Sequence, residues 1–182
     1  MMGQSGMMGG PGRSPPALPS CSVPALPGTV VEVTLADMHG MMGALPERQP
    51  GAPMGMMGGM MRIAINPATV PPGQVSFRVT NNGALNHELV IFLPPLAKGQ
   101  YPGQRAVGPD GTVDEAGSVG GEASRTCGAD KGDENTDNPG IAPGGSGWTT
   151  VNLTPGRYEL ICNISGHYWT GMYAELDVSP TK

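Results

Sequence analysis

The sequence has few basic residues, no long apolar run and no recognisable catalytic series, and each absence excludes a class of protein. Only 10 of its 182 residues are Lys or Arg, against 15 Asp or Glu, and they form no cluster. A nucleic-acid-binding surface is therefore not expected. No stretch approaches the ~18 consecutive apolar residues of a membrane span. No serine, histidine and acid series and no glycine-rich phosphate loop indicates an enzyme.

The beginning of the chain lacks the pattern of a secretory signal. Its first ten residues, Met-Met-Gly-Gln-Ser-Gly-Met-Met-Gly-Gly, contain neither a basic region nor an apolar run. Residues 1–27 are rich in Gly, Pro, Ser and Met without periodicity, which predicts a flexible leader that serves as a tether. Cys21 follows Leu-Pro-Ser, a weak match to a lipoprotein cleavage box. Lipidation at Cys21 is one interpretation, and an unmodified leader is the other.

Glycine and proline are abundant, and the apolar residues alternate along short segments. The 30 glycines and 20 prolines are too many for long helices. Alternation of period 2 predicts about seven strands, separated by Pro-Gly and Asn-Gly turn signals. Such a pattern indicates one all-β domain over residues 28–182, an antiparallel sandwich of about seven to eight strands. The predicted strands are 28–36, 60–65, 74–80, 86–93, 147–153, 156–162 and 173–178.

A group of metal-binding residue types lies between the last two predicted strands. Cys162, His167 and Met172 follow one another at five-residue intervals. A thiolate, an imidazole and a thioether form a soft, mixed ligand set that copper takes in an electron-transfer site when one more histidine is added. Gly166 and Gly171, each just before one of these residues, permit the tight backbone path that brings them to one ion.

The fourth ligand is predicted to be His87. It lies about seventy residues earlier, at the start of an apolar segment that a sandwich could place beside the hairpin. The chain has only three histidines, so His39 is the alternative.

The ordered set His87, Cys162, His167 and Met172 resembles the type 1 (blue) copper proteins of the cupredoxin family. The Cys-x4-His-x4-Met spacing is most similar to the rusticyanin, auracyanin and sulfocyanin branches. The segment Thr-Pro-Gly-Arg-Tyr-Glu-Leu-Ile-Cys resembles the family's strand before the copper loop. The segment Val-Pro-Pro-Gly-Gln-Val-Ser-Phe-Arg-Val-Thr-Asn-Asn-Gly resembles its strands before the first ligand.

The resemblance implies a Greek-key, cupredoxin-like sandwich and a function. The four residues would hold one copper ion that carries one electron, and the protein would not be an enzyme, because four protein ligands leave no open position. Its partners would be redox proteins such as a cytochrome or a terminal oxidase. We expect a monomer outside the cytoplasm, in the periplasm or on the outer face of the membrane, with membrane contact only through an anchor.

The resemblance also implies contacts around the ligands. Glu88 and Asn163 occupy positions where the family ties its two ligand segments together, so one hydrogen bond of this kind is expected. The outer edge of His167 would be the electron's exit, and Tyr168, Trp169 and nearby methionines are candidates for an apolar ring around it. Trp169 would either anchor a partner or cap the end of the sandwich.

Residues 38–60 form a predicted Met-rich loop. With Met61, this segment holds eight of the 13 methionines. Three interpretations remain: a flexible apolar cover for the sandwich, an adaptable docking surface, or an accessory Cu(I) site that includes His39. The third supports an alternative function for the whole protein, the binding and handling of Cu(I). A purely adhesive sandwich would bind no copper.

Residues 94–147 form a predicted long insertion without strand pattern. Between residues 110 and 140 it carries two bases and eight acids, namely Asp110, Asp114, Glu115, Glu122, Asp130, Asp133, Glu134 and Asp137. This stretch is either a solvated excursion or a patch that steers a basic partner. Cys127 within it could form a disulfide with Cys21, or both thiols could stay separate.

Overall fold

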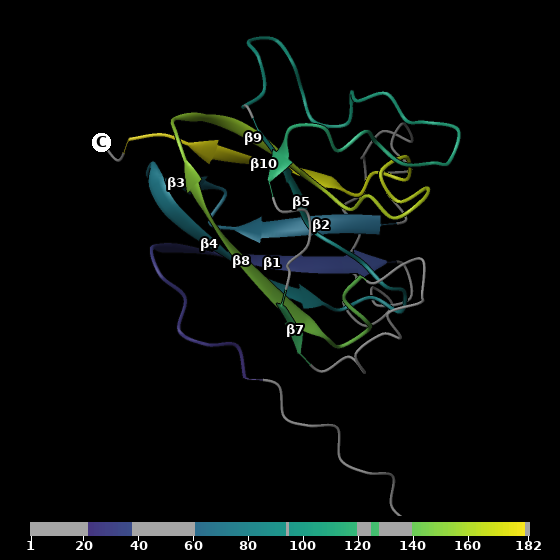
Figure 1. Cartoon of the computed structure of the whole chain (residues 1–182), viewed down its shortest axis with the longest axis horizontal. Coiled ribbons are helices and arrows are strands. Elements are labelled where there is room, and N and C mark those ends of the chain that lie inside the picture. Colours follow the sequence, from purple (N-terminus) through teal and green to yellow (C-terminus); the bar gives the residue numbers. More distant parts are fainter. Residues whose placement is uncertain (1–21, 38–60, 94, 120–124, 128–139, 181–182) are drawn as a thin grey trace, which may run out of the picture.

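The chain folds into two β-sheets (Figure 1). The computed structural model describes residues 22–37, 61–93, 95–119, 125–127 and 140–180. These residues form ten strands: β1 (Thr29–Asp37), β2 (Met61–Asn66), β3 (Thr69–Val70), β4 (Gly73–Asn81), β5 (Val90–Phe92), β6 (Ser118–Val119), β7 (Arg125–Cys127), β8 (Ser146–Leu153), β9 (Gly156–Ile161) and β10 (Tyr173–Val178).

The strand order brings distant segments of the chain together. One sheet has the order β2-β1-β4-β8-β7 and the other the order β3-β10-β9-β5-β6. Most neighbours are antiparallel, but β1 pairs with β4 and β3 with β10 in parallel. A parallel pair needs a crossover connection, and the chain between β1 and β4 makes one through β2 and β3. The predicted all-β sandwich is confirmed, although it is not purely antiparallel.

All seven predicted strands are present, with shifted ends. The additional strands β3, β6 and β7 have only two or three residues, too few to show an alternating pattern. The largest shift concerns the predicted strand 86–93, of which only Val90–Phe92 forms β5. His87 instead lies in an isolated antiparallel bridge with Ile141, so the first candidate ligand is held outside the regular sheet.

One hydrophobic core lies between the sheets. In β1 the inward residues Val31, Val33 and Leu35 are buried, as the alternation predicts. They belong to one cluster with residues of β4 and with Leu160 and Leu176 of the opposite sheet. Cys162 and Met172 belong to the same cluster. The candidate metal centre is therefore a continuation of the core at one end of the sandwich.

Figure 1 shows how this end is built. The loop between β9 and β10, in yellow, lies at the end of the sandwich where β1 stops. Part of the predicted insertion reaches the same loop, because the Val113 amide donates to the Asn163 side chain. The site is thus enclosed by segments far apart in the sequence.

Several predictions concern residues outside the described part of the chain. These are the leader up to Cys21, the Met-rich loop 38–60 with His39, and residues 120–124 and 128–139 of the insertion. The Cys21–Cys127 disulfide also stays a prediction, since Cys21 is among them. The described residues include no helix with the length and apolarity needed to cross a membrane.

Candidate metal centre

Four residues from two segments meet at the candidate metal centre. Cys162 directly follows β9, Met172 directly precedes β10, and His167 lies in the loop between them. His87 comes from the segment before β5, where its backbone exchanges two hydrogen bonds with Ile141. Because β5 and β10 both pair with β9, the sheet brings His87 beside the loop.

The side chains of His87, Cys162 and His167 converge. Their potential ligand atoms all lie within 4.8 Å of one another, and all three residues are buried. The Nδ1 atoms of the two histidines are 3.2 Å apart. The sulfur of Cys162 lies 3.3 Å from Nδ1 of His167 and 4.0 Å from Nδ1 of His87. The predicted meeting of the two distant segments is confirmed.

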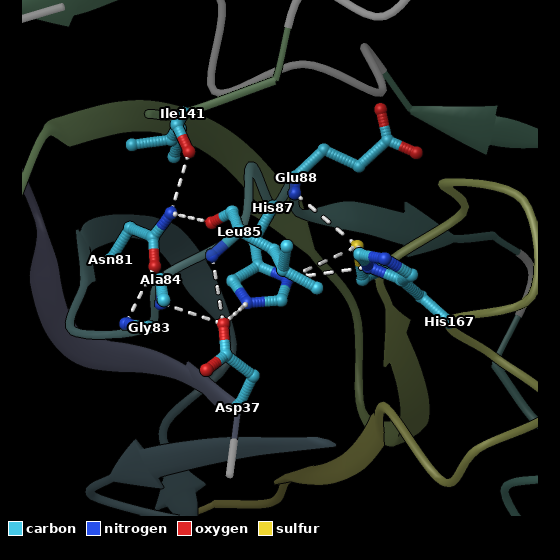
Figure 2. A network of polar contacts seen from close by, with 10 residues as sticks. Asp37, Asn81, Gly83, Ala84, Leu85, His87, Glu88, Ile141 and His167 are labelled. Carbon is cyan, nitrogen blue, oxygen red and sulfur yellow. Dashed lines mark hydrogen bonds and ion pairs between the residues drawn. The ribbon is translucent and has the colours of Figure 1, made fainter. Parts of the chain in front are cut away.

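A buried carboxylate fixes the orientation of the His87 ring. Nε2 of His87 lies 3.3 Å from Oδ2 of Asp37, and Figure 2 shows Asp37 and His167 on opposite sides of the His87 ring. A carboxylate oxygen can only accept a hydrogen bond, so Nε2 carries the ring proton and is the donor of this bond. In the neutral ring, Nδ1 then has a free lone pair, and this atom faces Cys162 and His167.

Both imidazoles are held in the neutral form. Burial lowers the pKa of His87, although the hydrogen bond that His87 donates to Asp37 opposes this shift. Burial, aided by repulsion from His87, lowers the pKa of His167 to about 4. Neutral imidazole is the form that binds a metal ion.

The Cys162 thiol is fully buried in the apolar cluster. Burial raises its pKa to about 12, while backbone hydrogen bonds, including that of Glu88, act in the opposite direction. The Glu88 amide lies 3.4 Å from the sulfur and donates to it. Without a metal the thiol keeps its proton, and a bound cation would displace that proton. The amide of Glu88 would stabilise the resulting thiolate.

The loop that carries His167 and Met172 is closed by its own backbone. The Cys162 amide donates to the Met172 carbonyl at 3.1 Å, and the Met172 amide to the His167 carbonyl at 3.2 Å. Gly166 and Gly171 have φ values of 82° and 99°, a region that favours glycine. This agrees with the predicted need for glycine before each of these residues.

The geometry and the chemistry of the donors fit a copper ion. An ion in a trigonal plane, with bonds of ~2.0 Å to nitrogen and ~2.3 Å to sulfur, separates its ligand atoms by roughly 3.5–3.8 Å. The separations of 3.2, 3.3 and 4.0 Å lie close to these values. Met172 is fully buried in the cluster that contains Cys162. The buried group of two histidines, one cysteine and one methionine matches a type 1 copper site.

Glu88 and Asn163, the two candidates for the one predicted tie between the ligand segments, make different contacts. The Glu88 amide joins the His87 segment to Cys162, so the expected hydrogen bond is confirmed there. Asn163 instead binds the insertion: its Oδ1 accepts from the Val113 amide at 2.7 Å, and its Nδ2 donates to the Val113 carbonyl and to Glu115. No pattern in the sequence predicts this contact.

The two aromatic residues after His167 lie in different surroundings. The Trp169 side chain is 80% exposed, so it does not cap the sandwich. Tyr168 is buried in a second cluster with Val90 and Phe92, and its hydroxyl donates to Glu159 and accepts from the Arg105 amide. The prediction that Tyr168 belongs to an exposed ring is therefore wrong, because its ring fills this second cluster.

Sequence reasoning missed two polar residues beside the site, Asp37 and Asn81. Both are buried, and each ends the inward-facing row of a strand that otherwise holds apolar residues, β1 and β4. A polar side chain at an inward position of an alternating strand is a signal that could have identified them. In Figure 2 both surround the turn that leads to His87.

The model of the sulfocyanin (SoxE) domain matches residues 54–181. No curated protein matches the chain.

Solved structures of copper proteins are similar to the chain. A 2.1 Å structure of the copper protein rusticyanin has 22% identity, covers 84% of this chain and 80% of its own, and has a TM-score of 0.41. Auracyanin from the photosynthetic bacterium Roseiflexus castenholzii has 24% identity, coverages of 64% and 88%, and a TM-score of 0.38. Rusticyanin from Thiobacillus ferrooxidans has 20% identity, coverages of 84% and 79%, and a TM-score of 0.38.

Proposed function

Because the chain belongs to the sulfocyanin (SoxE) domain family, we propose that it carries one electron between redox partners on a single copper ion. The observation that supports this proposal most directly is the buried convergence of His87, Cys162 and His167 within 4.8 Å. These residue types suit an ion that changes oxidation state. The proposal describes a carrier and not an enzyme, since four protein ligands would leave no position for a substrate.

In this proposal each residue of the site has a distinct role. His87 and His167 would bind the copper through Nδ1, Cys162 would bind it as the thiolate, and Met172 would supply its thioether. Copper would supply one-electron chemistry there, because it is stable as Cu(I) and as Cu(II). Cys162 gives up its proton on binding, and the Glu88 amide then donates to the sulfur anion.

The protein's contribution is to keep these side chains in place. His87 is held by the backbone bridge to Ile141 and by Asp37, while Cys162 is held by the Glu88 and Met172 contacts. Side chains fixed in this way cannot adopt the different geometries that the two oxidation states prefer. Little therefore reorganises when the electron moves, which favours fast transfer.

The outer edge of His167 is the proposed exit for the electron. His167 is 8% exposed, whereas His87, Cys162 and Met172 are all completely buried. Trp169, two residues further on, is exposed and has the character of an interface anchor. A partner that contacts this loop would come nearer to the copper than one bound elsewhere on the described surface.

The proposed partners are redox proteins such as a cytochrome or a terminal oxidase, outside the cytoplasm. The acidic residues of the insertion would attract a basic partner, which raises the rate of association at low salt. Asp110 and Asp114 are exposed, as this role requires. Stopped-flow mixing with a basic cytochrome should show an association rate that falls as ionic strength rises.

Visible and EPR spectra of the copper-loaded protein test the function. The wild type should show an intense charge-transfer band, a narrow copper hyperfine pattern and reversible one-electron chemistry. Cys162→Ser removes the sulfur and should abolish the band and the narrow pattern while the protein stays folded. Cys21→Ser and Cys127→Ser are matched controls, because each removes a thiol that the proposal does not use.

A spectrum unchanged by Cys162→Ser would contradict the proposal. A colourless protein that binds several Cu(I) ions would instead support the alternative, a protein that handles copper through its methionines. That alternative depends on residues 38–60, which lie outside the described part of the chain, so no structural observation favours it.

A further inference from the structure

Asp37 is a buried carboxylate directly behind the His87 ring. It ends β1 and is 4% exposed. Besides the contact with Nε2 of His87, its Oδ2 accepts from the Ala84 amide at 2.7 Å and from the Leu85 amide at 2.9 Å. A charge is costly to bury unless such donors compensate it. The three contacts on one oxygen hold the negative charge in place beside the ring.

The turn from residue 81 to residue 87 is folded around this carboxylate. The Asn81 side chain donates to the carbonyls of Leu85 and Ile141 and accepts from the Gly83 amide. A Cβ atom at Gly83 would lie 2.4 Å from Oδ2 of Asp37 and 2.8 Å from Nε2 of His87. The turn therefore has no space for a larger residue between the carboxylate and the ring (Figure 2).

We propose that Asp37 is a positioning residue that favours the oxidised form of the bound copper and so lowers its reduction potential. This inference rests on the proposed function. Asp37 accepts a hydrogen bond from Nε2–H of His87, and the unprotonated Nδ1 is thereby left to face the metal. The hydrogen bond to the negative charge of Asp37 also polarises the ring, which makes Nδ1 a stronger electron donor to the metal.

The direction of the effect follows from the charges. Oxidation raises the charge of the ion by one unit, and a fixed negative charge nearby stabilises the more positive state. Little water is present to weaken this attraction, because Asp37 and His87 are both buried. The removal of the charge should therefore shift the equilibrium toward Cu(I).

The test is a redox titration of the copper-loaded protein against a mediator of known potential. Asp37→Asn keeps an oxygen that can accept from the same donors but removes the charge. We expect about a tenfold shift of the equilibrium toward the reduced form, which is ~59 mV upward for one electron. Glu32→Gln is the matched control, because it removes one charge from an exposed position of the same strand, paired with Arg78, and should leave the equilibrium unchanged.

The possible results separate this inference from the proposed function. A wild-type protein with reversible one-electron chemistry and an unchanged equilibrium in Asp37→Asn overturns the role of Asp37 alone, as does a shift toward the oxidised form. An equal shift of the redox equilibrium in Glu32→Gln also overturns it, since the shift would then follow from the change in the protein's net charge and not from the position of Asp37. A wild-type protein without a type 1 spectrum overturns the proposed function and this inference together.

A measurement on the wild type keeps the inference testable if Asp37→Asn does not fold or retain copper. Cu(I) is diamagnetic, so NMR of the reduced protein can assign the ring nitrogens of His87. A slowly exchanging proton on Nε2 is the expected result. A His87 ring without a proton on Nε2, or with one that exchanges freely with water, overturns the inference.

Discussion

At the scale of single residues, buried polar side chains near the candidate metal centre form hydrogen bonds with specific partners. Tyr168 is an example, since its hydroxyl donates to the buried Glu159 at 2.9 Å and accepts from the Arg105 amide at 2.9 Å. Burial of the hydroxyl raises the pKa of Tyr168. The residue next to His167 is thus fixed in the protein interior.

Tyr168→Phe should lower the free energy of unfolding by about 1–3 kcal/mol, because two buried groups lose a hydrogen-bond partner. Denaturant titration of the copper-free protein measures this change. Tyr101→Phe is the control: Tyr101 is 60% exposed, so its loss should stay within about 0.5 kcal/mol. Equal effects of the two substitutions would show that the Tyr168 hydroxyl contributes nothing specific.

The residue scale also shows which part of the site was predictable. Cys162, His167 and Met172 were recognisable because sulfur and imidazole ligands on one short loop are rare without a metal. His87 could then be predicted as the fourth ligand, because the chain has only one other histidine that could take this place. Asp37 was missed because a carboxylate at the end of a strand is usually solvated, and only the two sheets together place it inside.

At the scale of elements, the segment from residue 95 to 119 is tied to the ligand loop by several hydrogen bonds, among them those of the Tyr168 hydroxyl, the Ser165 hydroxyl and the Gly166 amide. Asn163, directly after Cys162, makes three hydrogen bonds to Val113 and Glu115, with lengths of 2.7, 2.9 and 2.7 Å. The Val113 side chain is buried in the cluster of Phe92 and Tyr168. Part of the predicted insertion therefore packs against the loop that carries the candidate ligands.

Asn163→Ala should increase local opening of the segment around Val113 without unfolding the sandwich. The loss of the tie is expected to cost about 1–3 kcal/mol locally, so the Val113 amide should exchange with solvent roughly ten- to hundredfold faster. Hydrogen exchange measured by NMR tests this, with amides of β9 as internal references. Asn152→Ala, at an exposed position of β8, is the control and should leave Val113 unchanged. Unchanged exchange in Asn163→Ala would mean that other contacts hold the segment.

The sequence predicted the long strands well and the insertion poorly, for a physical reason. Strands such as β1 bury every second residue along their second half, so their pattern is visible locally. The segment 95–119 is held instead by side-chain hydrogen bonds and a short bridge between Val107 and Val113. The hydrogen bonds of Asn163 join residues about fifty positions apart, and neither they nor the short bridge leaves a period in the sequence.

At the scale of the whole molecule, the two histidines link folding to pH. Folding lowers the pKa of His167 to about 4, whereas an unfolded histidine titrates near 6.5. Below pH 6.5 the unfolded chain therefore binds a proton that the folded, copper-free protein does not. The stability due to neutral His167 is complete above the unfolded pKa and is lost as pH falls toward 4.

The copper-free protein should accordingly lose up to about 3 kcal/mol of unfolding free energy between pH 6.5 and 4. Denaturant titrations at several pH values measure this loss. His167→Gln, which cannot be protonated in this range, should show a flatter profile over the same interval. A wild-type profile as flat as that of the variant would show that His167 does not resist protonation in the folded state.

The backbone bridge between His87 and Ile141 has a consequence for engineering and for the divergence of relatives. It closes the long excursion at its far end, just as Asn163 secures Val113 nearer the start. Changes of length between residues 128 and 139, after β7 and before this bridge, should therefore not displace the ligand atoms. A fluorophore, an electrode linker or a fused domain inserted there should leave the colour of the protein as it was.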